Sequence, residues 1–197
     1  AAVMGEAPKA YLEETPDAAI CGRFHGFVHR FAKGPDLSAL LIGLKRVIRD
    51  YGSLNACFTD GLSQGDETVA PALAAFSRKI IDAAPMGSDP GHLMPCPEKG
   101  SACKRLHLYL RWMVRQDAVD PGGWQGISKA ALIVPLDVHM FRISRQLGLT
   151  RRNQANLRTA VEITDGFRRW SPLDPVRYDF ALTRFGIRKG LSGNPDL

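Results

Sequence analysis

The sequence lacks long apolar runs, and no stretch approaches the roughly 18 residues that a membrane-spanning helix needs. Its N-terminal region also lacks the basic and then apolar pattern of a secretory signal. Apolar and polar residues do not alternate convincingly, so the sequence predicts no strands. We therefore expect a cytoplasmic protein without a membrane partner.

Cysteine is scarce, with residues at positions 21, 57, 96 and 103 only. Cys96 and Cys103 have the opening spacing of some iron–sulfur loops, but no cysteine follows Cys103, so four neighbouring ligands cannot be assembled. Reduced thiols explain these residues better than a metal cluster or a disulfide scaffold. The sequence predicts no metal and no other cofactor.

Excess positive charge is confined to the second half of the chain. Residues 1–100 carry 10 Lys and Arg against 12 Asp and Glu, whereas residues 101–197 carry 16 against 8. This asymmetry suits a polyanion partner, with double-stranded DNA as the first choice and RNA as a possible substitute. A solvated basic surface is the alternative interpretation.

The apolar residues recur at helical spacing in most of the chain, so the predicted fold class is all-α. Proline and glycine interrupt the pattern at 85–100 and 121–123. We expect a helical front lobe over 1–90, a basic helical lobe over 91–190 and a solvated tail over 191–197. The helical spacing covers residues 20–31, 37–48, 69–80, 106–113, 157–167 and 178–185.

The segment P-C-P-E-K-G-S, residues 95–101, predicts a tight turn ahead of a helix. Ser101 is a suitable N-cap for that helix. Such a turn leaves backbone N–H groups and the positive end of the helix dipole exposed, which favours phosphate binding at Lys99, Gly100 and Ser101.

On the helix that follows, Lys104, His107, Arg111 and Arg115 share one face. This face is either a solvent-exposed stripe or the cationic wall of a cleft. In a cleft, Arg111 and its neighbours would favour the neutral amine of Lys104, the form that attacks an electrophilic carbon.

Asp137 lies between the apolar run I-V-P-L and a basic amphipathic helix. It can be the N-cap of that helix. An ionised carboxylate beside apolar walls can also stabilise positive charge on a sugar carbon or accept a proton from an amine. His139 has either a structural or a catalytic role. The arginines downstream are predicted to contact phosphates, namely Arg142, Arg145, Arg151 and Arg152.

The stretch P-L-D-V-H-M-F-R-I-S-R, residues 135–145, resembles the segment carrying the catalytic aspartate in helix-hairpin-helix DNA glycosylases. It is most similar to the 8-oxoguanine glycosylases. Most of 95–190 also resembles a bacterial family catalogued as a domain of unknown function, through K-R-L-H-L-Y-L-R-W-M-V-R, I-V-P-L-D-V-H and D-P-V-R-Y-D-F-A-L. The resemblance implies a two-lobed helical glycosylase-like domain with a helix-hairpin-helix element. It also implies a further helix before position 1, which this sequence lacks.

By this resemblance, Asp137 matches the catalytic aspartate and Lys104 the lysine nucleophile. The base-pocket candidates are Arg111, Asp179, His139 and Trp112, of which the resemblance implies Arg111 and Asp179. The turn departs from the family, because C-P-E-K-G replaces L-P-G-V-G. Alignment on its glycine puts the usual lysine position on Ala102, two residues or about 200° of an α-helix before Lys104. Lys99 is therefore an alternative nucleophile.

Two functions are consistent with these features. The first is a DNA glycosylase with lyase activity, in which Lys104 and Asp137 excise an oxidised purine that has been flipped out of the duplex. Trp112, Trp124 or Phe141 would stack on the base, or else belong to the core. The second is a non-catalytic binder of DNA or structured RNA. In either case we expect a nucleoid-associated monomer.

Overall fold

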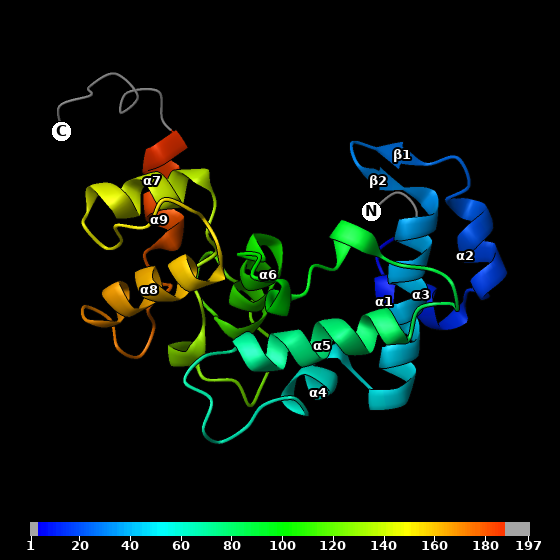
Figure 1. The fold of residues 1–197 in the computed structure, drawn as a ribbon. Coiled ribbons are helices and arrows are strands. Elements are labelled where there is room, and N and C mark those ends of the chain that lie inside the picture. Colours follow the sequence, from blue (N-terminus) through cyan, green and yellow to red (C-terminus); the bar gives the residue numbers. More distant parts are fainter. Residues whose placement is uncertain (1–3, 188–197) are drawn as a thin grey trace. The chain divides into compact units, whose positions relative to one another are not determined.

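A computed structural model describes residues 4–187, and Figure 1 shows their course. This part of the chain is mostly helical, which confirms the predicted all-α class. It divides into two compact units, one comprising 4–61 and 72–95 and the other 62–71 and 96–187. Within the described range, no helix is both long enough and apolar enough to cross a membrane.

The first unit is built around the long helix α3, Gly34–Tyr51. Three shorter helices pack against it: α1 (Pro8–Glu14), α2 (Asp17–Arg23) and α4 (Leu54–Thr59) (Figure 1). Apolar side chains at helical spacing on α3 pack with those of α1 and α2 to form its core, including Leu12, Ile20, Phe24, Leu41 and Ile42. Helix α5 (Ala70–Asp82) and the 3-10 turn η1 (Gly91–Leu93) complete the elements of this region.

The helix predicted over 20–31 is wrong beyond Arg23, where α2 ends. Gly26 adopts a φ of 74°, which a continuing helix does not allow. The chain instead forms an antiparallel hairpin of β1 (Val28–His29) and β2 (Ala32–Lys33), with Val28 opposite Lys33. The apolar residues of this segment therefore do not form one buried helical face.

The second unit contains α6 (Lys104–Val114), α7 (Val138–Gln146), α8 (Leu157–Arg168) and α9 (Asp179–Ile187). The 3-10 turn η2 (Pro97–Lys99) precedes α6, and η3 (Lys129–Ala131) lies between α6 and α7. Helices α7 and α9 pack against each other (Figure 1). Residues 62–71 belong to this unit because the Val69 amide donates to the Ala131 carbonyl at 2.9 Å. The predicted tail at 191–197 lies outside the described residues.

Candidate functional site

Lys104 and Asp137 meet at the beginnings of two helices. Asp137 is the N-cap of α7, and its Oδ1 accepts hydrogen bonds from the backbone amides of His139 at 3.0 Å and Met140 at 2.9 Å. Its Oδ2 lies 3.7 Å from Nζ of Lys104, the first residue of α6. The lysine side chain is 40% exposed and the aspartate side chain 23%. One carboxylate oxygen therefore caps a helix while the other faces an amine that solvent can reach.

The apolar run before Asp137 fixes the position of this carboxylate. Residues 132–136 are buried, and the Val134 amide donates to Thr164 Oγ1 of α8 at 3.0 Å. Because β-branched and leucine side chains bury well on both sides of an extended segment, the chain is held in the core until it turns into α7. The sequence I-V-P-L thus delivers Asp137 at a fixed point at the edge of the core.

The two residues line one hollow of about 480 Å³. Arg111 and Asp179 contribute a second polar pair to its lining. Trp112 and Phe180 are both exposed aromatic residues of the same lining. The remaining apolar residues of the wall are Leu108, Val119, Pro121 and Pro135. A hollow with aromatic walls and two polar pairs suits a flat ligand with a polar edge.

Arg111 belongs to a buried network of ion pairs. Its Nε donates to Asp120 Oδ2 at 3.2 Å, its Nη2 lies 3.1 Å from Asp120 Oδ1, and its Nη1 pairs with Asp179. Asp120 is fully buried and also pairs with Arg115. Burial raises the pKa of the Asp179 carboxyl, and the Arg111 guanidinium opposes that rise.

The solvent-exposed stripe expected on α6 is wrong, and of the cationic cleft wall that was the alternative, only Lys104 and Arg111 line the hollow. His107, Arg111 and Arg115 are buried. Besides Asp120, Arg115 pairs with Asp117 Oδ2 at 2.8 Å and with Asp174 Oδ2 at 3.0 Å. The carboxylates therefore offset the arginine charges, because buried guanidinium groups need partners.

His107 is unlike its neighbours on this face. Its side chain is 1% exposed, and neither ring nitrogen has a hydrogen-bond partner among the residues that the structure describes. Burial lowers the pKa of His107 to about 4. The residue is therefore a neutral core histidine at physiological pH and is not part of a cationic wall.

The start of α6 differs from the predicted one. Ser101 is not the N-cap: the helix begins at Lys104, after Cys103 in a left-handed conformation with φ 42°. Ser101 Oγ instead accepts from the Cys103 amide at 3.3 Å. Ala102, the position that alignment on Gly100 gives to the family lysine, precedes α6. The offset of two residues between Ala102 and Lys104 therefore lies in the segment before the helix, and it does not correspond to a rotation of about 200° around α6.

The turn itself forms as predicted, with Gly100 at φ 78° and its amide donating to the Pro97 carbonyl at 2.8 Å. The Gly100 carbonyl accepts from the Leu157 amide at 3.1 Å, so the turn is joined to the start of α8. Lys99 is exposed in the turn and does not line the hollow of Lys104. This geometry favours Lys104 over Lys99 as the residue opposite Asp137.

The other predicted aromatic and imidazole groups are separated. Trp112 lines the hollow, whereas Trp124 packs edge-on against Tyr109 with ring centroids 5.5 Å apart. Phe141 lies beside the Arg145 guanidinium, 5.9 Å from it. His139 is half-buried in the first turn of α7 and is not in the lining of the hollow.

The predicted phosphate-contacting arginines lie at two places. Arg142 and Arg145 are exposed on α7. Arg151 and Arg152 line a separate hollow of about 610 Å³, where Arg152 Nε lies 2.5 Å from Glu162 Oε2 and lowers the pKa of that carboxyl. Sequence reasoning missed two further arginines of this hollow, Arg158 and Arg169.

The sequence spacing of Arg158, in α8, and Arg169, its C-cap residue, could have identified them as residues of one surface. Residues 158, 162, 165 and 169 are three or four positions apart, as expected for one face of a helix.

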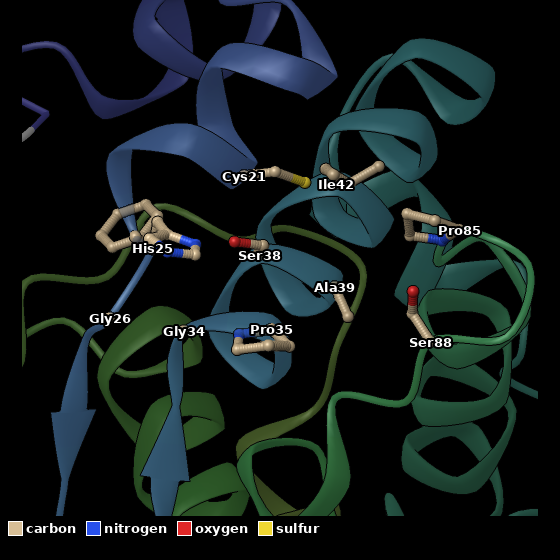
Figure 2. A pocket seen from close by; sticks show the side chains of 11 residues that line it. Cys21, His25, Gly26, Gly34, Pro35, Ser38, Ala39, Ile42, Pro85 and Ser88 are labelled. Carbon is tan, nitrogen blue, oxygen red and sulfur yellow. The ribbon is translucent and has the colours of Figure 1, made fainter.

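A third cavity, of about 380 Å³, lies in the first unit and was not predicted. Figure 2 shows the Cys21 thiol, the His25 ring and the Ser38 hydroxyl at its wall, with Ala39 and Ile42 from α3. All four cysteines are thiols. Residues 4–187 contain no group of three or more His, Cys, Asp or Glu side chains placed to hold a metal ion.

Comparison with known proteins adds a family. The family described as "Protein of unknown function (DUF2400)" matches residues 1–188. The chain belongs to this family. No curated protein and no solved structure matches the chain.

Proposed function

We propose that this DUF2400 protein is a DNA glycosylase with lyase activity, which excises an oxidised purine from double-stranded DNA. The observation that supports the proposal most directly is the 3.7 Å approach of Lys104 Nζ to Asp137 Oδ2 in one hollow. An amine and an acid at such a site are the two groups that a lysine-dependent glycosylase requires. The proposal includes a glycosylase-like scaffold, in which the turn η2 and helix α6 would be the hairpin and second helix of a helix-hairpin-helix element.

In the proposed reaction, the solvent-accessible Lys104 ammonium releases a proton to water while Asp137 stays ionised, and the neutral amine attacks C1′ of the sugar. The bond from C1′ to the base breaks, and the base leaves with the electron pair and takes up a proton. Positive charge develops at C1′ as that bond breaks, and the Asp137 carboxylate stabilises it. Opening of the sugar ring then gives a Schiff base on Lys104, from which elimination of the 3′ phosphate cleaves the strand.

The remaining lining of the hollow suits the base. Trp112 and Phe180 provide aromatic faces for stacking, which helps to offset the few kcal/mol that extrusion of a base costs. Arg111 and Asp179 provide a donor and an acceptor for a purine edge.

Arg142 and Arg145 of α7, and Arg151 and Arg152 in the segment between α7 and α8, would contact phosphates on either side of the extruded nucleotide. We also propose that the protein acts as a monomer and is associated with the nucleoid. A second function is favoured by the hollow lined by Arg151, Arg152, Arg158 and Arg169, which does not involve Lys104. With those arginines alone, the protein would be a non-catalytic nucleic-acid binder.

Trapping with borohydride distinguishes the two functions. Borohydride reduces a Schiff base to a stable amine, so the protein becomes covalently attached to labelled DNA. We expect adducts with a duplex containing 8-oxoguanine and with one containing an abasic site. Lys104→Ala should abolish both, whereas Lys99→Ala should abolish neither. Loss of the adduct in Lys99→Ala alone would assign the nucleophile to Lys99.

Asp137→Asn tests the acid with little change in structure. Asparagine is as good an N-cap as aspartate, so α7 should keep its start while the negative charge is lost. We expect this variant to bind the duplex normally and to form the adduct ~10²–10³-fold more slowly, the usual effect of removing one preorganised group that stabilises developing charge. Salt-sensitive binding without any adduct in the wild-type protein would refute the enzyme and support the binder.

A further inference from the structure

The segment 18–35 carries only positive charge. It contains Arg23, Arg30 and Lys33, together with His25 and His29, and no Asp or Glu. This segment lies in the half of the chain that is acidic overall, so an average over that half conceals it. Within residues 4–184, none of these three cations forms an ion pair. Their charge is therefore available to an anionic partner.

The same segment exposes apolar side chains. Phe31, at the tip of the hairpin, is 85% exposed, Val28 is 70% exposed and Phe27 is 40% exposed. Exposed apolar groups beside unpaired cations are typical of surfaces that bind another molecule.

The hairpin is held rigidly at its base. The Gly34 amide donates to the Phe27 carbonyl at 2.7 Å, and the Lys33 amide donates to Asp36 Oδ2 at 2.9 Å. A side chain at position 34 would collide with the Phe24 carbonyl oxygen, so the strand enters α3 by a close backbone contact. The exposed tip is therefore carried on a fixed support.

The tip has an unusual backbone conformation for its sequence. Arg30 has a φ of 55° in a two-residue turn, where glycine or asparagine is ordinarily found. Arginine and phenylalanine occupy the two turn positions although neither is favoured by the turn. Such outliers are concentrated at functional sites.

We propose that this hairpin binds unpaired nucleic acid, with Phe31 stacking on an exposed base and Arg30 and Lys33 contacting phosphates. A phenyl ring can stack only on a base whose face is open, so the partner is a single strand or an unpaired region and not an intact duplex. Cations without carboxylate partners supply the contacts to the backbone. The proposal does not depend on Lys104, because it concerns binding and involves residues of the other unit.

The test measures the affinity of the full chain for fluorescein-labelled oligothymidine by anisotropy. Phe31→Ala should weaken binding by about 5- to 100-fold, the effect of losing one base–aromatic stack, and Phe31→Trp should retain it. Arg30→Ser should reduce the slope of log affinity against log salt by about 0.7. Met86→Ala, which removes another exposed apolar side chain of the same unit, should change nothing.

Arg30→Gly separates a binding role from a folding role. Glycine relieves the positive φ, so the thermal midpoint of this variant should not fall below that of the wild type, yet its affinity for oligothymidine should fall. Oligouridine and an intact duplex are the comparison ligands. A larger loss of affinity of the Phe31 and Arg30 variants for oligouridine than for oligothymidine would identify RNA as the preferred partner, and a similar loss for both single strands would indicate either nucleic acid. Either result supports the proposal.

Three results would overturn it. The first is oligothymidine and oligouridine binding by Phe31→Ala that equals the wild type. The second is binding of the wild-type protein to phosphatidylserine vesicles, if Phe31→Ala abolishes that binding and leaves single-strand binding unchanged. The third is self-association in light scattering that depends on Phe31, with single-strand binding unchanged. Absence of a borohydride adduct would leave all of these measurements intact, so failure of the proposed enzyme is distinguishable.

Discussion

Acid should destabilise this protein through His107. The ring is buried, and within the described part of the chain neither nitrogen has a hydrogen-bond partner. Burial lowers the pKa of His107 from 6.5 to about 4, so between these values the unfolded chain binds a proton that the folded chain does not. The contribution to stability is complete above pH 6.5 and is lost as the pH falls toward 4.

The size of the effect follows from the two pKa values. At pH 5, protonation of the unfolded state lowers the free energy of unfolding by about 2 kcal/mol, and below pH 4 the loss reaches about 3 kcal/mol. His107→Leu removes both the titrating group and two unpaired nitrogens. We expect the variant to be about 1 to 3 kcal/mol more stable than the wild type at neutral pH. Its advantage should grow by about 2 kcal/mol at pH 5.

Urea unfolding followed by circular dichroism at neutral pH and at pH 5 measures this difference. The other titrating groups are common to both proteins, so their contributions cancel in the comparison. His29→Gln is the matched control, because His29 is exposed. An advantage of His107→Leu that is the same at both pH values would refute the reasoning, since it would mean that the ring takes up protons equally in the folded and unfolded states.

Three further predictions test the supports of the two units. Gly34→Ala should lower the free energy of unfolding in urea by about 3 kcal/mol or more, because its Cβ would lie 2.0 Å from a backbone oxygen, whereas Gly22→Ala has open space and should raise it by about 0.5 kcal/mol. Asp137→Ala should cost about 1 kcal/mol in thermal melts and Asp137→Asn only a few tenths, so equal costs would argue against a capping role. Asp120→Asn should cost about 3 to 5 kcal/mol in urea, against about 1 kcal/mol or less for the exposed Asp165→Asn; similar costs would contradict the buried network.

Local chemistry explains why part of the candidate site was predictable. An aspartate directly before a helical pattern is a strong capping signal, and Asp137 caps α7 as predicted. The pairing of Asp137 with Lys104 came from the family resemblance. No spacing rule connects two residues 33 positions apart. The start of α6 was not predictable, because Cys103 adopts a left-handed conformation that sequence favours only for glycine or asparagine.

Periodicity failed where both faces of a helix are buried. The polar face of α6 reads as a solvent stripe because its residues are charged. Its arginines are instead buried against carboxylates, and Asp174 and Asp179 lie far along the chain from α6. A helical period identifies which residues share a face but gives no information about the partners of that face. The prediction for the hairpin segment was wrong for a related reason. The spacing of Phe27, Val28 and Phe31 predicted one helical face, whereas the structure exposes all three side chains.

The two oxygens of Asp137 explain how one residue can be both structural and reactive. Oδ1 is fixed by two amides of α7, so the position of Oδ2 is determined by the helix and by the buried segment before it. Lys104 has a long, half-exposed side chain, so its amine can occupy many positions. The fixed carboxylate favours the positions of the amine that lie close to it. In the proposed reaction, the negative charge would already be in place when positive charge forms on the sugar, and no reorganisation would be needed at that moment. The helix cap therefore fixes the position of the carboxylate charge, which is where the proposed reaction would need it.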